Sequence, residues 1–465
     1  MKEGKLRNAS SSITLALLFL SLFAFAFTLQ TARAQSEGTI IINPDGSITP
    51  SNASITTSDN VTYTFTGNNY LPIIVNRSNI IINGMGHTLQ ISSLSENGFS
   101  LSGMSNVTIK NTTITNSNYG NILLSSYGIF LISSDNNTLS GNTVTANIVG
   151  IDFYASSGNV LSGNNVTANG GGIELDSSSD NNTLSGNSVT GTSYVGIELE
   201  YSCDNNTLSG NNITANNGDG IDLGYSCESN TFSGNNITTN IGDDGIGLYS
   251  SSGNIFYHNN FINNALQVYS TNSSNTWDNG APSGGNYWSE YLARYPSATE
   301  IGYYAIWNTP YVIDANNTDR YPLMGPFNTF SVGTWNGTAY SVDTVSNYTI
   351  TDLSFSATAK TLSFNVTGAN GTAGFCRVTI PFSLMSGDFA VTANGKARSF
   401  SYSKEENYTY VYFTCHQGTE TVKITSTSAI PEFQPYMLLP LLMIITLLTA
   451  AVSKRKRKVV HIGAC

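Results

Sequence analysis

Residues 136–142 read NNTLSGN, and this phrase returns along the chain at nearly constant spacing. Close copies are GNVLSGN at 158–164, NNTLSGN at 181–187 and 205–211, SNTFSGN at 229–235 and a weaker GNIFYHN at 253–259. The positions aligned with Gly141 are 163, 186, 210, 234 and 258, so the steps are 22, 23, 24, 24 and 24 residues. A fixed period in this range indicates a repeat architecture.

Each repeat has few apolar residues, and they keep fixed positions. Those in 181–204 and in the next copy are Leu184, Val189, Ile197 and Leu199, then Leu208, Ile213, Ile221 and Leu223. The Ile-x-Leu step has the period of a strand with one buried face, and Gly, Asn, Ser and Thr disfavour a helix. Four side chains cannot form a core alone, so successive turns must stack. We therefore predict an all-β chain built on a parallel β-helix of about eight turns.

Asparagine recurs at one corner of every predicted turn. The aligned residues are Asn142, Asn164, Asn187, Asn211, Asn235 and Asn259. Asn and Gly tolerate the left-handed backbone that tight corners need. Stacked Asn side chains can also hydrogen-bond along the ladder. We expect a structural role for these asparagines.

The length and the two ends of the chain indicate several parts. With 465 residues, 40% hydrophobic and 11% charged, the chain is too long for one compact core, and its net charge of −11 argues against a nucleic-acid partner. Lys2, Lys5 and Arg7 precede an apolar run and Ala32-Arg33-Ala34, which predicts a signal peptide over 1–34. The apolar run 436–452 is followed by KRKRK, which predicts one transmembrane helix. The protein is expected at the cell surface, with its N-terminal bulk outside and a basic cytoplasmic tail at 453–465.

The rest of the chain divides by changes in pattern. Residues 35–78 do not repeat and are predicted to cap the β-helix, whose repeats span 79–274. Residues 275–328 contain Trp277 and Trp288, which are large enough to close the other end. Residues 329–428 alternate as in strands and predict a β-sandwich, followed by a linker at 429–435.

Charge gives the clearest functional signal in the repeats. Residues 111–293 contain no Lys or Arg but 15 Asp and Glu. Six of these acids fall at outward positions of the Ile-x-Leu strands: Asp152, Glu174, Asp176, Glu198, Glu200 and Asp222. Carboxylates stacked ~4.8 Å apart repel by roughly 1 kcal/mol in water. The column is therefore open to three interpretations: a solvated acidic face, a binding site for a divalent cation such as calcium, or a carboxylate pair for glycoside hydrolysis.

The hydrolase interpretation has five candidate carboxylates and one restriction. The alternative catalytic candidates are Glu174, Glu198, Asp222, Asp243 and Asp244. Gly242-Asp243-Asp244 resembles the paired aspartates of polygalacturonase-type β-helices, but the repeats offer no basic residue for an acidic sugar. Neutral-sugar binding remains open, with Tyr201 and Tyr225 either presenting their rings to a ligand or packing on each other.

Two pairs of cysteines are disulfide candidates. Cys203 and Cys227 lie one repeat apart, and adjacent turns place Cα atoms ~4.8 Å apart, within disulfide range. Cys376 and Cys415 lie in two strands of the predicted sandwich. Asn-x-Ser/Thr sequons such as those at Asn336, Asn347 and Asn365 also predict a glycoprotein.

The N-x-L-S-G-N and G-I-x-L phrases resemble the NosD-like family of right-handed parallel β-helix proteins, also described as carbohydrate-binding and sugar-hydrolysis repeats. The resemblance covers about 35–327, and the exit segment, sandwich and anchor resemble archaeal cell-surface members. It implies the fold, carbohydrate as a ligand class and, through the family's namesake, copper. The sequence has few potential copper ligands. Only His87, His258 and His416 lie in the part predicted to be extracellular, and no His-x-His or Met-rich cluster exists.

The preferred hypothesis is a non-enzymatic, membrane-anchored surface protein that binds carbohydrate or cell-envelope components through its β-helix. The first alternative is a glycoside hydrolase that uses the carboxylates named above. The second is a copper-handling accessory protein. No cofactor and no metal ligand set is assigned.

Overall fold

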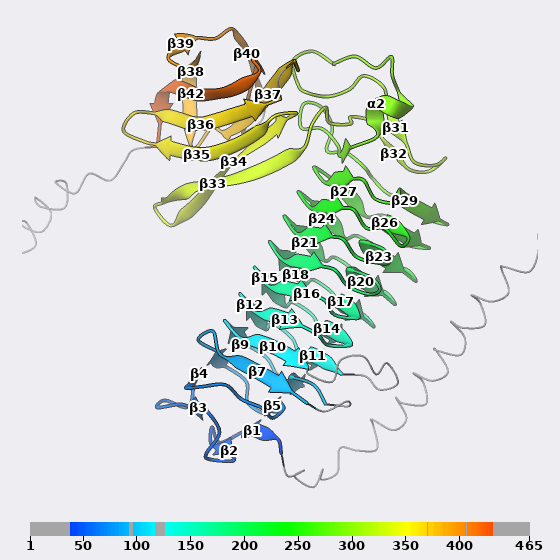
Figure 1. Cartoon of the computed structure of the whole chain (residues 1–465), viewed down its shortest axis with the longest axis vertical. Coiled ribbons are helices and arrows are strands. Elements are labelled where there is room, and N and C mark those ends of the chain that lie inside the picture. Colours follow the sequence, from blue (N-terminus) through cyan, green and yellow to red (C-terminus); the bar gives the residue numbers. More distant parts are fainter. Residues whose placement is uncertain (1–37, 93–95, 117–125, 370, 406, 431–465) are drawn as a thin grey trace, which may run out of the picture. The chain divides into compact units, whose positions relative to one another are not determined.

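The computed structural model describes residues 38–92, 96–116, 126–369, 371–405 and 407–430. The predicted signal peptide (1–34), transmembrane helix (436–452) and basic tail (453–465) lie outside the described residues. Within the described ranges no helix is long and apolar enough to cross a membrane. The chain divides into two compact units between Asp204 and Asn205, and each is described by itself (Figure 1).

The first unit consists of three parallel sheets whose strands follow one another in every turn. Sheet A contains β1 (Ile40–Ile42), β5 (Ile73–Val75), β8 (Phe99–Ser102), β11 (Tyr127–Ile132), β14 (Val149–Tyr154), β17 (Gly171–Asp176) and β20 (Ile197–Glu200). Sheet B contains β4 (Thr62–Phe65), β6 (Ile80–Asn83), β9 (Val107–Lys110), β12 (Thr138–Ser140), β15 (Val160–Ser162) and β18 (Thr183–Ser185). Sheet C contains β7 (Thr88–Ile91), β10 (Thr113–Asn116), β13 (Thr143–Thr145), β16 (Asn165–Thr167) and β19 (Ser188–Thr190). Strands β6 to β20 form five complete turns.

Residues 38–78 already contribute strands to this unit. Strand β1 pairs in parallel with β5, and β4 pairs in parallel with β6. Two short strands, β2 (Ile48–Thr49) and β3 (Ile55–Thr56), pair antiparallel with β1 and β4. The antiparallel strands occupy the sheet edges at the start of the β-helix, where an open edge would otherwise be exposed.

The second unit begins with three more turns of the same kind. Their strands are β21 (Thr207–Ser209), β22 (Asn212–Thr214), β23 (Ile221–Gly224), β24 (Thr231–Ser233), β25 (Asn236–Thr238), β26 (Asp244–Tyr249), β27 (Ile255–Tyr257), β28 (Asn260–Ile262) and β29 (Leu266–Thr271). The two units together thus contain eight complete turns, as the repeat predicted. The inward residues Leu208, Ile213, Ile221 and Leu223 are fully buried, as are their counterparts in the first unit.

The asparagine corners form hydrogen-bonded ladders inside the β-helix. Asn142 donates its backbone N–H and its side-chain Nδ2 to Oδ1 of Asn164, at 3.0 and 3.1 Å. Asn164 Nδ2 in turn donates to Asn187 Oδ1 at 2.9 Å. The left-handed position of the corner is the preceding glycine, such as Gly141 with φ 61°, rather than the ladder asparagine. Glycine therefore supplies the backbone conformation, and asparagine supplies the hydrogen bonds.

A stack of aromatic rings follows the last turn. Trp277 packs on Phe256 with ring centroids 4.4 Å apart, and Trp288 of β30 (Tyr287–Trp288) packs on Phe261 at 4.3 Å. Trp288 Nε1 donates to Asp319 Oδ2 at 2.9 Å. Both tryptophans are buried, as expected for residues that close the core. The segment also contains α2 (Tyr291–Arg294) and the strands β31 (Tyr311–Val312) and β32 (Thr318–Asp319).

Two five-stranded antiparallel sheets follow and share one hydrophobic core. One contains β33 (Phe327–Trp335), β34 (Thr338–Ser346), β37 (Gly374–Pro381), β41 (Tyr408–Cys415) and β40 (Phe400–Glu405). The other contains β35 (Thr349–Ser356), β36 (Thr361–Gly368), β42 (Gly418–Ala429), β38 (Met385–Ala393) and β39 (Lys396–Ala397). Leu362 and Val422 from one sheet pack with Val378 and Val411 from the other.

The structure has Cys376 and Cys415 as buried thiols that are not joined to each other. The register of β37 and β41 sets Cys376 opposite Phe413 and Cys415 opposite Gly374. The two cysteines are therefore diagonal neighbours, and such positions lie roughly 7–8 Å apart, beyond the roughly 6.8 Å that a disulfide spans. Cys203 and Cys227 are buried in different units, and their pairing stays a prediction.

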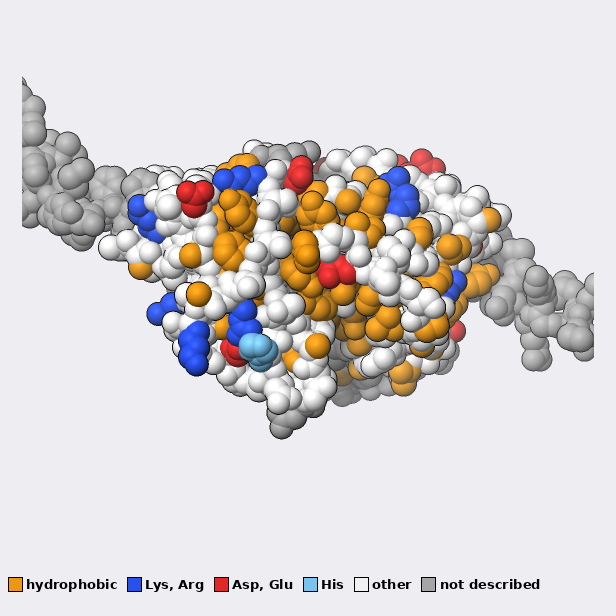
Figure 2. Space-filling model, turned by 90° about the horizontal axis from the view of Figure 1, so that it is seen from above, with side chains coloured by type: hydrophobic (Ala, Val, Ile, Leu, Met, Phe, Trp, Pro, Cys, Tyr) orange, Lys and Arg blue, Asp and Glu red, His pale blue; other side chains and the backbone are white. Residues whose placement is uncertain are grey.

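Basic side chains are concentrated after the repeats. Beyond Arg77 and Lys110, every Lys or Arg of the described chain lies between Arg294 and Lys423. Figure 2, the view from above, accordingly shows several Lys and Arg side chains around a broad area of hydrophobic ones, with few Asp or Glu. From residue 111 to the last turn, the β-helix carries acidic groups and no basic ones.

Candidate functional site

The predicted acidic columns form on the outer side of sheet A in the first unit. Strand pairing sets Asp152 beside Glu174 and Glu174 beside Glu198 on successive turns. A second column two residues further along sets Asp176 beside Glu200. The register follows from the constant repeat length, because equal turns bring equivalent residues side by side.

None of the six predicted column residues, which include Asp222 in the second unit, is exposed. Asp152 is 6% exposed, and its Oδ1 has no hydrogen-bond partner in the described chain. The other five side chains are half-buried. The acidic face is therefore partly solvated, with Asp152 as its one buried member, and its interpretation as a solvated face stays a prediction.

Burial and mutual repulsion hold these carboxyl groups toward their neutral forms. Burial raises the pKa of Glu174 to about 8, with a further contribution from Asp176 and Glu200. Burial and the nearby Asp176 raise the pKa of Glu200 to about 7. The pKa of Asp152 is raised for the same two reasons, burial and the carboxylates of Glu174 and Asp176. A protonated carboxyl can donate as well as accept a hydrogen bond, so this face offers both functions.

The second unit has a different arrangement on the outer side of sheet A. The outward position after Asp222 is Gly247, and the next is Tyr269. A Cβ on Gly247 would lie 2.7 Å from Asp219 Oδ2 and 2.9 Å from Tyr249 Cε2. The glycine therefore lets a carboxyl group and a tyrosine ring pack directly over the strand, where the Cβ of any other residue would collide with both.

Two tyrosines and two aspartates lie close together on this face, and we name Asp219, Asp244, Tyr249 and Tyr269 the tyrosine–carboxylate cluster. The rings of Tyr249 and Tyr269 lie 5.5 Å apart between centroids, and Tyr269 is 42% exposed. Asp219 Oδ1 accepts the backbone N–H of Asp244 at 2.6 Å. Burial raises the pKa of Asp219 to about 7 and that of Asp244 to about 6, with Asp243 adding to both shifts.

The remaining predicted residues take other positions. Asp243 is exposed, so Asp219, rather than Asp243, is the buried partner of Asp244. Tyr201 and Tyr225 are 44% and 50% exposed. Asp219, Tyr249 and Tyr269 were not among the site residues predicted from the sequence. Tyr249 stood in the outward column of the alignment, but Asp219 lies in a corner segment whose direction the repeat does not specify.

Comparison with known families agrees with the observed turns. Residues 38–213 match the model of the right-handed β-helix region. Residues 169–293 match the model of NosD, described as a periplasmic copper-binding protein. The chain belongs to the NosD-like family of right-handed β-helix repeat proteins.

Solved structures similar to this NosD-like chain include several polysaccharide-processing proteins. A mutant of the periplasmic alginate epimerase AlgG is 17% identical with a TM-score of 0.33, covering 44% of this chain and 62% of its own. The pectate lyase Pel9A is 15% identical with a TM-score of 0.31, covering 47% and 70%. The enzymatically active domain of bacteriophage CBA120 tailspike protein 2 is 11% identical with a TM-score of 0.37, covering 82% and 68%. None of the curated proteins compared with the chain matches it.

The residues of this NosD-like chain do not fit a copper site. Within the described ranges no group of three or more His, Cys, Asp or Glu could hold a metal ion. His258 is held neutral, because burial and Arg377 lower its pKa to about 3, and its Nε2 lies 3.1 Å from the Ser283 backbone oxygen. His416 lies beside Arg398 and Glu420 in the antiparallel sheets. The described residues therefore offer no copper site, and calcium at the acidic columns stays a prediction.

Proposed function

We propose that this protein binds neutral carbohydrate, without catalysis, through the outer side of sheet A. The observation that carries the proposal is the tyrosine–carboxylate cluster around Gly247. Tyrosine rings can stack on the apolar faces of sugar rings, and carboxyl groups accept hydrogen bonds from sugar hydroxyls. Packing over Gly247 brings both kinds of group to one place on this face.

The charge distribution supports a neutral ligand over an acidic one. No Lys or Arg occurs from 111 to 293, whereas carboxyl groups line sheet A in both units. An anionic sugar would meet repulsion there and would find no guanidinium or ammonium partner. A neutral sugar avoids this repulsion and can exchange hydrogen bonds with the partly protonated carboxyl groups.

We further infer that the protein works at the cell surface, held by one transmembrane helix at 436–452. The support is the sequence of the ends: a signal-like segment at 1–34, and a second apolar run followed at once by five basic residues. Ligands in the cell envelope, either its own polysaccharides or those of a neighbouring cell, would be accessible from this position.

Replacing Tyr269 with alanine is expected to weaken sugar binding about tenfold, because one ring stacking on a sugar contributes on the order of 1–2 kcal/mol. The measurement is a glycan array followed by calorimetric titration of the full-length protein. The matched control is Tyr70→Ala, which removes an exposed tyrosine distant from Tyr269 in the sequence, and this variant should bind the sugar normally. Equal affinity of the Tyr269→Ala variant and the wild type would show that the ligand lies elsewhere.

A second candidate function, glycoside hydrolysis, is favoured by one observation. The pKa of Glu174 is raised to about 8, so this side chain is protonated at neutral pH, as a general acid must be. Glu198 lies beside it on the next turn, near the spacing that retaining enzymes use for their two carboxyl groups. Release of reducing ends from neutral polysaccharides, abolished in Glu174→Gln and unaffected in Tyr269→Ala, would establish this activity. No release from any polysaccharide tested would remove it.

A further inference from the structure

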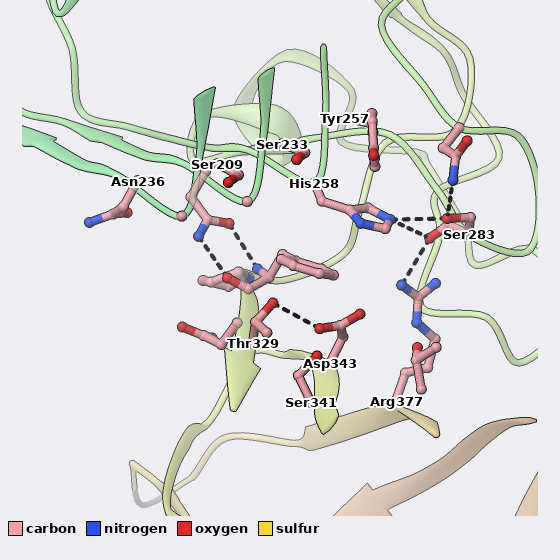
Figure 3. Close-up of a pocket in the computed structure, with 18 of the residues that line it drawn as sticks. Ser209, Ser233, Asn236, Tyr257, His258, Ser283, Thr329, Ser341, Asp343 and Arg377 are labelled. Atoms are coloured by element: carbon pink, nitrogen blue, oxygen red, sulfur yellow. Dashed lines mark hydrogen bonds between the residues drawn. The ribbon is translucent and has the colours of Figure 1, made fainter. Parts of the chain in front are cut away.

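A cavity of about 830 Å³ lies in the second unit, on a different side of the β-helix from sheet A. One wall consists of residues from the corners between β21 and β22, between β24 and β25, and between β27 and β28. The other wall consists of strands β33, β34, β37 and β41 (Figure 3). No pattern in the sequence predicted this cavity, because its two walls come from segments with unrelated patterns.

The β-helix wall presents the same polar groups on successive turns. Ser209, Ser233 and Tyr257 occupy one column, and Asn212, Asn236 and Asn260 occupy another. Asn236 Nδ2 donates to Asn212 Oδ1 at 3.0 Å, which aligns the two amides along the column. Adjacent turns are ~4.8 Å apart. The wall therefore repeats its hydrogen-bonding groups at a spacing comparable to the length of one pyranose residue in an extended glycan.

The two walls are held together at Phe327. Asn260 Nδ2 donates to the Phe327 carbonyl oxygen, and the Phe327 N–H donates to Asn260 Oδ1, both at 2.8 Å. The Phe327 ring stacks on His258, with centroids 4.2 Å apart. This contact buries Asn260 at the end of the asparagine column, while Asn212 and Asn236 remain half-buried beside the cavity.

The charged groups in the cavity argue against a charged ligand. Arg377 is 1% exposed, and its Nη atoms donate to the backbone oxygens of Pro282, Ser283 and Tyr304 at 2.7–2.9 Å. Its two Nη atoms are thus bound to the protein, whereas its buried Nε–H has no partner in the described chain. Asp343, which accepts the Thr329 hydroxyl at 2.8 Å, brings a carboxyl group to the same wall as Arg377. An anion would be repelled by Asp343 and would reach little of the buried Arg377, which is 1% exposed, and a cation would lie close to that guanidinium.

We propose that this cavity is a second carbohydrate site, which binds a linear neutral glycan lying along the turns. Side-chain amides of Asn212 and Asn236 and hydroxyls of Ser209, Ser233 and Ser341 bind the sugar hydroxyls. Tyr257 and Tyr408 supply rings for the apolar faces of the sugars. This proposal rests on the proposed function, because it assigns the same class of ligand to a second surface. Substitutions in the cavity and on sheet A can be tested independently of each other.

The test compares variants in the same position of two different turns. Asn212 begins β22 in the sequence N-I-T and lines the cavity, whereas Asn165 begins β16 in the sequence N-V-T and lies outside it. Full-length protein from a host that does not glycosylate is titrated with cellohexaose, mannohexaose and laminarihexaose, and with hexagalacturonate as the acidic probe. We expect at least one neutral hexaose to bind, and the Asn212→Ala,Asn236→Ala variant to lose roughly tenfold or more in affinity, the effect of one or two hydrogen bonds.

The controls separate this proposal from the site on sheet A. Asn165→Ala should bind like the wild type, and Tyr408→Ala, at an exposed ring, should weaken binding without affecting the fold. Tyr269→Ala should leave the affinity that depends on Asn212 and Asn236 unchanged, whether or not it lowers a second binding event. Equal loss in Asn165→Ala and in the cavity variant, preference for hexagalacturonate, or no binding of any neutral hexaose would each overturn the proposal.

Discussion

Replacing Asn164 with alanine is expected to lower the free energy of unfolding by about 3–5 kcal/mol, because several buried polar groups lose their partners at once. Asn164 is 1% exposed and binds four groups. Its Oδ1 accepts the backbone N–H and Nδ2 of Asn142, and its Nδ2 donates to the Leu139 carbonyl oxygen and to Asn187 Oδ1. Denaturant unfolding of the full-length protein, followed by circular dichroism, measures the change.

The neighbouring residue provides the control. Asn165 is exposed, and its backbone N–H, not its side chain, bonds to the Asn142 carbonyl oxygen. Asn165→Ala should therefore change stability by less than about 0.5 kcal/mol. If the two variants lost the same stability, the ladder would not be what holds adjacent turns together, and the stacked apolar core would carry that role alone.

The protein is expected to become less stable as pH rises from about 4.5 to about 8, and Glu174→Gln should reduce this loss. The pKa of Glu174 is about 8 in the folded protein against an ordinary value of 4.5. Between these values the folded state binds the proton more tightly than the unfolded state, so raising pH favours unfolding. A single such group contributes a slope of at most about 1.4 kcal/mol per pH unit. Its contribution is complete below pH 4.5 and lost above pH 8.

Glutamine keeps the shape of the protonated side chain and cannot ionise. The Glu174→Gln variant should therefore unfold at higher denaturant concentration than the wild type at pH 8, and at a similar concentration at pH 4.5. Some slope will remain, because burial also raises the pKa of Glu200 to about 7. Glu405→Gln, at an exposed position on β40, should leave the pH profile unchanged. A profile for Glu174→Gln that parallels the wild type would mean that solvent reaches this carboxyl group in solution.

The β-helix could be predicted from the sequence because its interactions connect residues one period apart. Leu184, Val189, Ile197 and Leu199 occupy inward positions and are fully buried, as the alignment indicated. The Asn142–Asn164 hydrogen bonds and the Asp152–Glu174 register follow from the same constant spacing. Each turn repeats the same arrangement of inward and corner residues. Aligning the repeats therefore predicts the contacts between every two adjacent turns.

The burial of the acidic column could not be predicted from the repeat. Alternation predicts that Asp152 points away from the core, and it does not predict that the side chain is 6% exposed with an unpartnered oxygen. Exposure depends on what packs over a surface, whereas alternation reports only the direction of each side chain. The sequence likewise could not predict the strand register at Cys376 and Cys415, where an offset of two residues separates the thiols.

The sequence by itself determined the repeat, the number of turns, the residues inside them and the absence of basic groups from 111 to 293. Only the tertiary structure decided which polar groups meet. Asp219 packs against Gly247 from a corner, and Asn260 binds Phe327 across 67 residues of sequence. Such contacts join segments that are not equivalent positions of the repeat, so the repeat spacing does not predict them. The tyrosine–carboxylate cluster and the cavity beside β33 both arise from contacts of this kind.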